Sequence, residues 1–420
     1  MTDFNRRDFL RASGAVFGAL ATGRFGLNAF ADDKGGAVKT VVVLYMRGGA
    51  DSLSLVAPYT DATYRKIRPT IAVPPPGADG GALDLGGGFG LHPSMKGLHA
   101  LYKKGMFAPI LNVGSPHPTR SHFDAQDFME YAAPGVRTIT EGWLNRWLTA
   151  TNEGKRKEVE LRALAAQPLL PRALRGQFPV LAVPEDRAMQ AMDAFEDQYG
   201  KGEKKDGMEK RPDDPAERIL GAGQETIRKL RFLQDILAKG EGAGGVKYPA
   251  TSLGRQFQGI AQVIKAGCGL EVAAADYNGW DHHAKQGVDD GQMAEMLKNV
   301  SEALSAFAED LGEARMKDVL VLTMSEFGRT VAENGNNGTD HGHGGIMLAL
   351  GGQVDGGKIF GKWTGLEPKS LYEDRDMPVH TDFRLPFTEV LSTFLGFTKL
   401  EKFFPDWKPQ APALGFLKKA

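Results

Sequence analysis

The sequence has 420 residues, of which 42% are hydrophobic and 25% are charged; this is ordinary globular composition and enough chain for one large domain or two smaller ones. The formal net charge of −1 leaves no basic excess of the size that nucleic-acid binding requires, so we expect no nucleic-acid partner. Cys268 is the only cysteine, which excludes an intrachain disulfide and does not by itself decide the compartment.

The N-terminal residues predict an export signal. Residues 5–11 read Asn-Arg-Arg-Asp-Phe-Leu-Arg, a twin-arginine motif, and a short stretch of small and apolar residues follows at 12–20. Residues 29–31, Ala-Phe-Ala, match a cleavage signal, and the apolar stretch is too short to span a bilayer. We therefore expect 1–31 to be a signal peptide handled by the twin-arginine translocon. The mature protein would be periplasmic or secreted, with no transmembrane anchor after cleavage; the alternative is an amphipathic N-terminal helix.

Apolar and β-branched runs predict the strands of a sheet. The strongest runs are at 39–46, 107–113, 270–275 and 319–324, and shorter strands are expected at 159–165, 180–183, 346–350 and 358–360. Helical spacing and capping signals predict helices at 123–131, 251–266, 292–311 and 382–395. Residues 71–90 are rich in Pro, Gly and Asp, which indicates a loop. Strands that alternate with helices indicate an α/β fold with a mostly parallel sheet.

The composition changes between residues 188 and 240, where charge rises and aromatic residues become rare. Residues 201–214 are nearly all polar, which is typical of a solvated loop. Helices are expected on either side of this loop, at 189–199 and 215–237. We interpret 188–240 as a charged helical insertion in a domain that runs over 38–415.

Several predicted strands end in acidic side chains, imidazoles or both. Because ligands of open α/β sheets bind outside the carboxyl ends of the strands, we expect these side chains to converge. Mixed Asp and His ligation suits one or two divalent ions, with Zn, Mn, Fe or Ca as the candidates. The predicted metal ligands are Asp51, Asp281, His283, Glu326, Asp340, His341 and His343. His282 can take the place of His283, and His380 is a further candidate that can instead cap the following helix.

The predicted catalytic residues are Ser121, His122 and Arg329. A hydroxyl at a helix N-terminus, such as that of Ser121, would meet an anion where backbone N–H groups favour it. His122 would act as general acid or base, and Arg329 would bind non-bridging oxygens of the substrate. Two of the three have a structural alternative, because Ser121 can simply cap the helix and Arg329 can close a loop by an ion pair with Glu326.

Five ordered motifs resemble those of the DUF1501 family. They are LYMRGGADSL at 44–53, RSHFDAQD at 120–127, GWDHH at 279–283, SEFGRT at 325–330 and TDHGHG at 339–344. The resemblance covers about 41–395 and implies the architecture of the alkaline phosphatase/sulfatase-like superfamily. That architecture is a three-layer α/β sandwich with a mostly parallel central sheet.

The resemblance also implies roles for individual residues. Asp51 matches the first metal-binding Asp of the superfamily, and Ser121 lies where the nucleophile is expected, with Thr119 or water as alternatives. The later ligand pairs fall on Asp281 with His283 and on Asp340 with His341, and the last histidine on His343 or His380. Two departures are visible. Glu326 occupies the strand end where Asp-His is usual, and the sulfatase pattern Cys-x-Pro-x-Arg is absent, which disfavours a formylglycine sulfatase.

Together these features predict an exported metal-dependent hydrolase of phosphate or sulfate esters. Its partner would be a small anionic ester substrate or an extracellular polymer. The alternative is a non-catalytic exported protein for binding or surface assembly, which retains the fold and a structural metal. An oxidoreductase is disfavoured, because no G-x-G-x-x-G fingerprint opens a predicted helix.

Overall fold

The computed structural model describes residues 38–152, 161–183, 215–240, 245–401, 403–409 and 412–419. The predicted signal peptide at 1–31, the predicted helix at 189–199 and the polar loop at 201–214 lie outside the described residues. The chain divides into two compact units. The larger unit consists of Lys39–Ile139, Gly245–Ala261 and Ala275–Ala420, and the smaller unit includes Thr140–Gly244 and Gln262–Ala274.

The larger unit is built on a sheet whose strands lie in the order β11-β5-β10-β9-β1-β8. Their bounds are β1 Thr40–Arg47, β5 Phe107–Gly114, β8 Val272–Asn278, β9 Val319–Met324, β10 Gly345–Gly351 and β11 Thr381–Asp382. β1 pairs with β9 and β11 pairs with β5 in parallel, whereas β10 is antiparallel to both of its neighbours. Continuous burial of β1 and β9 explains their unbroken apolar sequences, since a central parallel strand is covered on both faces.

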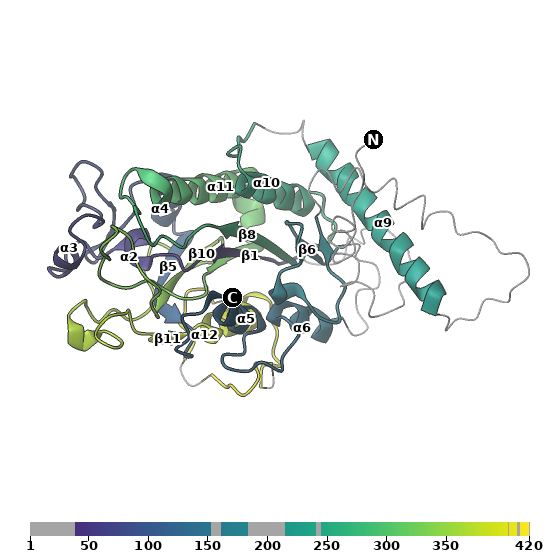
Figure 1. The fold of residues 1–420 in the computed structure, drawn as a ribbon. Helices are drawn as coiled ribbons and strands as arrows, with labels where there is room; N and C mark the ends of the chain where they lie inside the picture. The colour runs from purple at the N-terminus through teal and green to yellow at the C-terminus, as the bar shows by residue number, and fades with distance from the viewer. Residues whose placement is uncertain are drawn as a thin grey trace, which may run out of the picture. The chain divides into compact units, whose positions relative to one another are not determined.

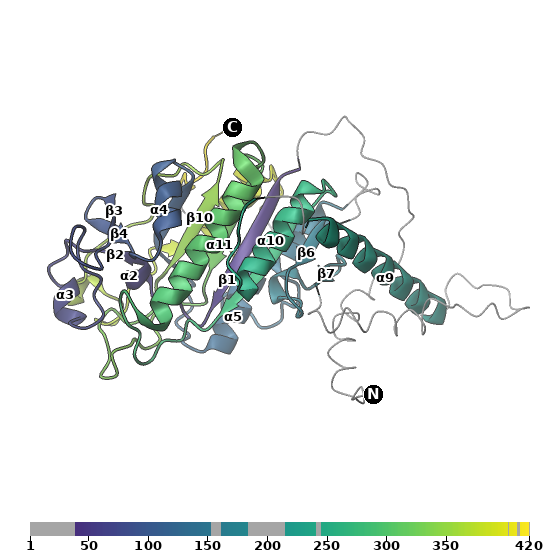
Figure 2. The ribbon, with the colours of Figure 1, turned by 90° about the horizontal axis from the view of Figure 1, so that it is seen from above.

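Helices cover both faces of this sheet, as Figure 1 shows. On one face lie α4, Lys96–Lys103, and α11, Gly291–Met316, and Figure 2 shows α11 running along the strands. On the other face lie α5, His122–Tyr131, and α12, Arg384–Glu389, which continues into the π-helical turn η3, Val390–Phe394. The predicted α/β fold, a three-layer sandwich with a mostly parallel sheet, is confirmed.

A small second sheet extends the larger unit beyond the first strand. It contains β2, Val56–Ala57, β4, Phe89–Leu91, and β3, Leu83–Gly86, in antiparallel pairing. The short helices α2, Ser52–Leu55, and α3, Tyr64–Ile67, lie in the same segment. The prediction of a loop over 71–90 was therefore wrong in its last part. Its turn residues hid a short strand pairing, because glycines at positive φ join β3 to β4.

The smaller unit contains short elements and one long helix. These are α6 Trp143–Ala150, β6 Ala163–Ala165, the 3-10 turn η1 Arg172–Leu174, β7 Leu181–Ala182, and α9 Pro215–Gly240. β6 pairs in parallel with β7 and with the first residues of β8. α9 confirms the predicted helix at 215–237, and α10, Ser252–Lys265, confirms the one at 251–266.

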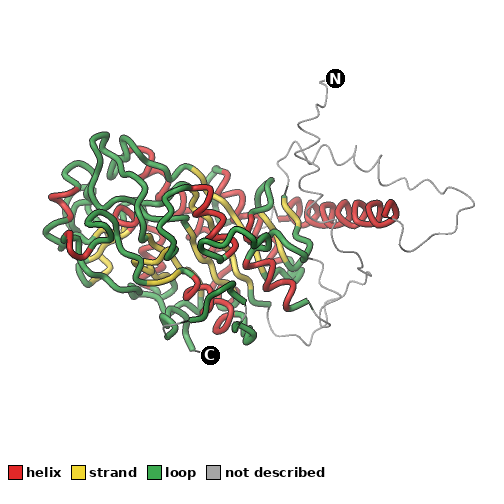
Figure 3. The backbone as a smooth tube through the Cα atoms, turned by 60° about the horizontal axis from the view of Figure 1, so that its bottom comes forward, coloured by secondary structure: helices red, strands yellow, loops and turns green. Residues whose placement is uncertain are grey.

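Loops make up much of the larger unit, as Figure 3 shows. The predicted strand at 358–360 is one such loop, with only an isolated bridge between Ile110 and Phe360.

Among the helices of the described residues, none has both the length and the apolar character needed to cross a membrane.

Candidate metal centre

Three side chains from separate segments of the larger unit converge where strands β5, β8 and β9 end. They are His122 in the first turn of α5, Asp281 after β8, and His341 between β9 and β10. One ligand atom from each lies within 4.8 Å of the other two. His122 Nε2 is 3.4 Å from Asp281 Oδ2, and His341 Nε2 is 3.1 Å from Asp281 Oδ1. The three side chains are 26%, 42% and 24% exposed, so the group is open to solvent on one side.

The orientation of His122 follows from the start of α5 and from a buried carboxylate. Ser121 is the N-cap residue of α5, and its carbonyl accepts a hydrogen bond from Ala125 N at 2.9 Å. His122 Nδ1 lies 2.8 Å from Oε1 of Glu326, a side chain that is fully buried. A carboxylate only accepts, so Nδ1 carries the proton and Nε2 presents its lone pair to Asp281. Within the described part of the chain, Nε2 is buried and has no hydrogen-bond partner.

Glu326 is ionised in this environment. Its Oε1 also accepts hydrogen bonds from Gly48 N at 2.9 Å and from Gln126 Nε2 at 3.0 Å. Burial disfavours its charged form, but the hydrogen bonds from His122 and Gln126 outweigh burial, and the pKa of Glu326 lies below its ordinary value. The hydrogen bond from His122 to Glu326 in turn raises the pKa of the imidazole. Glu326 therefore lies behind His122, on the side of the ring that faces away from Asp281.

Asp281 is held by Arg329. The buried Arg329 guanidinium donates to Asp281 Oδ1 and to backbone carbonyls on three neighbouring segments. Those acceptors are the carbonyls of Gly48, Gly49, Trp280 and Thr339. Partial burial acts to raise the pKa of Asp281, but the hydrogen bond and charge of Arg329 outweigh it and lower the pKa to about 2. Arg329 thus keeps Asp281 ionised, and its donors are directed at the protein itself.

The glycine pair at 48–49 permits this close packing. Gly48 has φ +124°, a conformation that residues with a side chain rarely adopt. A Cβ added to Gly48 would lie 2.6 Å from the backbone nitrogen of Asp281. The first strand and the Asp281 loop can therefore approach only where no side chain intervenes.

His341 reaches the group because two loops pair with each other. Thr330 N donates to Asp340 O at 2.9 Å, and Gly342 N donates to Gly328 O at 2.9 Å, so the segment after β9 and the segment before β10 run side by side. His341 Nδ1 donates to Arg120 O at 2.8 Å, which leaves its Nε2 lone pair facing Asp281. Burial lowers the pKa of His341, which favours the neutral ring.

A third imidazole borders the group. His283 Nδ1 lies 2.9 Å from Asp340 Oδ1, so it too carries its proton on Nδ1. Its Nε2 lies 3.0 Å from Asp281 Oδ1 and 3.1 Å from His341 Nε2. The hydrogen bond from His283 lowers the pKa of Asp340, and Asn334 Nδ2 donates to the same oxygen at 3.1 Å.

These hydrogen bonds leave the group with acceptors that face one another. With Nδ1 protonated in each ring, the Nε2 lone pairs of His122, His283 and His341 all point toward the Asp281 carboxylate. Acceptors this close repel one another unless a cation lies among them. A proton can join only one pair, whereas a metal ion can meet several ligand atoms at once. The residues therefore fit a divalent ion, and a carboxylate or carbonyl behind each imidazole is the usual support of a metal-binding histidine.

The structure places two other predicted ligands elsewhere. Asp51 is buried and pairs with the equally buried Arg68, whose Nη1 and Nη2 lie 2.6 and 2.9 Å from its two oxygens. His343 is nearly buried and packs its ring on Tyr372, with the centroids 4.4 Å apart. Ser121 is exposed at the start of α5, and its side chain makes no cap hydrogen bond there.

Three residues around the site were not among those predicted from the sequence: Gln126, Arg68 and Gln286. Gln126 lies four residues after His122, and that spacing puts both side chains on one face of a helix, so the motif at 120–127 contains the signal. Arg68 and Gln286 have no comparable signal. They lie in irregular segments, and only the folded chain brings them to Asp51.

The fold and site define an α/β protein with a candidate metal centre at the end of its sheet. The chain belongs to the DUF1501 family, because the family model described as "Protein of unknown function (DUF1501)" matches residues 38–391. No curated protein matches the chain.

Two solved structures are similar in fold at low identity. One is the C-terminal periplasmic domain of EcEptC from Escherichia coli, in complex with Zn; it has 9% identity and a TM-score of 0.38, with 76% of this chain and 75% of that chain covered. The other is the lipoteichoic acid synthase LtaP from Listeria monocytogenes, with 7% identity and a TM-score of 0.37, covering 87% of this chain and 74% of that chain.

Proposed function

We propose that this protein is an exported metal-dependent hydrolase of phosphate or sulfate esters. The observation that supports it is the group formed by His122, Asp281 and His341, in which the Nε2 atoms of both imidazoles face a carboxylate. Imidazole and carboxylate ligands suit Zn, Mn or Fe better than Ca. Catalytic zinc sites have three protein ligands and keep one position for water or substrate, and the partial exposure of this group leaves such a position.

A bound divalent ion would polarise an ester oxygen and make a coordinated hydroxyl or water more nucleophilic. The chain supplies the other parts of the reaction. The first turn of an α-helix offers backbone N–H groups that favour an anion, and Ser121 exposes its hydroxyl at the start of α5. His122 was expected to be the general acid or base but lies among the candidate metal ligands, so we assign that role to His283, expected as a ligand. Its Nε2, with Asp340 behind its other nitrogen, would accept the proton of the attacking hydroxyl or water. In hydrolysis the ester oxygen leaves with a proton, and one water is consumed.

The test measures metal content and turnover together. Protein purified through its native export route should contain about one or two equivalents of metal and hydrolyse p-nitrophenyl phosphate or p-nitrophenyl sulfate. His341→Ala should lose both properties. The control is His380→Ala, since His380 is an exposed imidazole whose Nε2 pairs with Thr364 and takes no part in the group.

Two results would contradict the proposal. A folded wild-type protein without metal would exclude the metal centre. A wild-type protein that holds metal, binds the esters and turns over neither would favour the non-catalytic binding protein. The exposed Ser121 side chain, which makes no hydrogen bond that would activate it within the described residues, is the feature most compatible with that second outcome.

A further inference from the structure

A buried polar network lies beside the metal centre and is centred on Asp51. Asp51 Oδ1 accepts a hydrogen bond from Arg68 Nη2 at 2.9 Å. Its Oδ2 accepts from Arg68 Nη1 at 2.6 Å, from Ser54 Oγ at 2.6 Å and from Gln286 Nε2 at 2.9 Å. Four donors thus surround a carboxylate that is 1% exposed. Such a carboxylate has little capacity left to bind a metal ion.

The network reaches both loops that carry the metal centre. Gln286 is buried, lies three residues after His283, and accepts a hydrogen bond on Oε1 from Thr339 Oγ1 at 3.1 Å. Thr339 lies two residues before His341, and its backbone N donates to His282 O at 2.9 Å. Asp51 is therefore connected through one glutamine to the Asp281 loop and to the His341 loop.

Arg68 extends the same connection to a third point. Its Nε donates to Val331 O at 2.7 Å, and its Nη2 donates to Thr330 O at 2.9 Å. Those carbonyls directly follow Arg329, the side chain that holds Asp281. Arg68 thus binds Asp51 and two carbonyls of the neighbouring loop at once. A buried ion pair with such contacts holds that loop in place, because the hydrogen bonds are lost if the loop moves.

We propose that Asp51, Arg68 and Gln286 are positioning residues for the metal centre, and that Asp51 is not itself a metal ligand. This inference rests on the proposed metal site. The proposal is that these residues hold the Asp281 and His341 loops at a fixed separation, so that the ligand atoms of the metal centre lie within 4.8 Å of one another. Residues that orient ligands from behind typically change metal affinity about 10- to 100-fold when they are replaced.

The experiment titrates Zn²⁺ alone into metal-free protein against a chelator of known affinity. Gln286→Met removes the hydrogen bonds of the glutamine with Asp51, Ser54 and Thr339, whereas Thr339→Val removes only the last of these, and neither variant leaves a charge unpaired. Both should weaken Zn²⁺ binding by roughly 10- to 100-fold, with the wild-type number of ions still bound at saturation. The matched control is Thr323→Val, another buried threonine, whose Oγ1 accepts from Leu348 N outside this network.

A structural role alone would give a different result. It would lower the unfolding temperature of Thr339→Val and Thr323→Val alike and leave Zn²⁺ affinity unchanged in both. A second pair of variants tests Asp51 directly. Asp51→Asn should weaken Zn²⁺ binding, and Asp51→Asn with Gln286→Glu should restore part of it, because a carboxylate returns to the network at a different residue.

Each outcome decides the inference. Wild-type affinity in both Gln286→Met and Thr339→Val would overturn it, as would a full loss of bound Zn²⁺ in Asp51→Asn that Gln286→Glu does not rescue. Either result would leave the proposed metal site in place. Wild-type protein that binds no Zn²⁺ would overturn the proposed function, and this inference with it.

Discussion

Glu326 and His122 face each other across 2.8 Å, and the nitrogen of His122 that does not contact Glu326 faces Asp281. This pairing fixes the tautomer of the imidazole, since the buried carboxylate can only accept the Nδ1 proton. It also explains how a glutamate at a strand end would support the proposed metal centre without contacting the ion. The carboxylate sets the direction and basicity of the ligand in front of it.

Replacing Glu326 with Gln should weaken metal binding by about 10- to 100-fold. His122, Gln126 and Gly48 N all donate to Oε1, and an amide oxygen in that place keeps the acceptor but loses the charge that strengthens these hydrogen bonds and the basicity of His122. The measurement is Zn²⁺ affinity by chelator competition. Glu389→Gln is the control, because Glu389 is also buried but accepts hydrogen bonds from Gly415 and Leu417. Equal affinities in the two variants would show that the Glu326 contact has no role in metal binding.

Asp340→Asn should reduce kcat while the protein keeps its metal. Asp340 is the partner of His283 Nδ1, and an asparagine in its place no longer favours the tautomer that leaves Nε2 free to accept a proton. Loss of an oriented general base lowers turnover by about 10²-fold. Steady-state kinetics on p-nitrophenyl phosphate, beside elemental analysis of the same preparation, separate the two effects. Loss of the metal in Asp340→Asn would instead make Asp340 a ligand.

The sheet could be predicted from the sequence because its strands are buried on both faces. Val41, Val42 and Leu44 in β1 and Leu320 and Leu322 in β9 are fully buried, and continuous apolar runs of this kind are typical of central parallel strands. The short strands β3 and β4 could not be predicted, since turn residues separate them and each has only a few residues to pair.

The site was predictable in its residue types and less so in its arrangement. His122, Asp281 and His341 lie after strands, and the rule that strand ends converge brings them together. The same rule predicts that Asp51 joins the site, yet Arg68 donates hydrogen bonds to both of its carboxylate oxygens instead. Spacing along the chain does not show which buried cation will reach which carboxylate. That is decided by the path of the segment between Asp51 and Arg68, which has no periodic pattern.

Stability should fall between pH 6.5 and pH 4 because of His92. This imidazole is buried, its Nε2 donates to Val288 O at 2.6 Å, and its Nδ1 accepts from Ser94 N at 3.2 Å. Burial lowers the pKa of His92 to about 4. Above pH 6.5 the ring is neutral in both the folded and unfolded chain. Below pH 6.5 the unfolded chain takes up a proton first, so the loss reaches about 3 kcal/mol once the pH falls to 4.

The measurement is urea unfolding at pH 7, 5.5 and 4, for the wild type and for His92→Gln. The glutamine retains a donor for Val288 and does not titrate, so wild type should lose stability relative to the variant as the pH falls. Carboxylates titrate in both proteins and cancel in the difference. A difference that stays constant from pH 7 to pH 4 would mean that His92 accepts its proton without cost.

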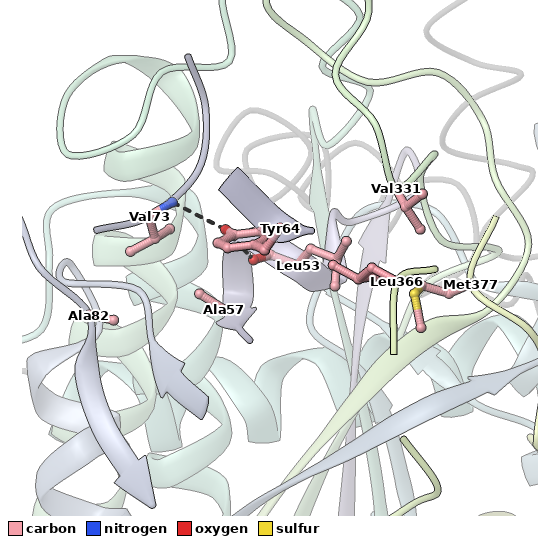
Figure 4. Close-up of a cluster of buried hydrophobic side chains, with 8 residues drawn as sticks. All are labelled: Leu53, Ala57, Tyr64, Val73, Ala82, Val331, Leu366 and Met377. Atoms are coloured by element: carbon pink, nitrogen blue, oxygen red, sulfur yellow. Dashed lines mark hydrogen bonds between the residues drawn. The ribbon is translucent and has the colours of Figure 1, made fainter. Parts of the chain in front are cut away.

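Tyr64→Phe should destabilise the larger unit by about 1–3 kcal/mol. Tyr64 is the polar member of a buried cluster that also contains Leu53, Ala57 and Val73, as Figure 4 shows. Its hydroxyl donates to Leu53 O at 3.0 Å and accepts from Val73 N at 3.1 Å, so it satisfies two backbone groups that no water can reach. Removing the hydroxyl oxygen deprives Leu53 O and Val73 N of this partner, while the apolar packing of the ring is unchanged.

The comparison is with Tyr59→Phe, measured by the same urea unfolding. Tyr59 donates its hydroxyl to Asp84 at the surface, where water replaces the lost contact, so its removal should change stability by less than about 0.5 kcal/mol. Because both substitutions delete the same atom, the difference between them reports the cost of stranding buried backbone groups. Equal effects would mean that the Tyr64 hydroxyl contributes no more than a surface one. The segment between Leu53 and Val73 would then be held by apolar burial alone.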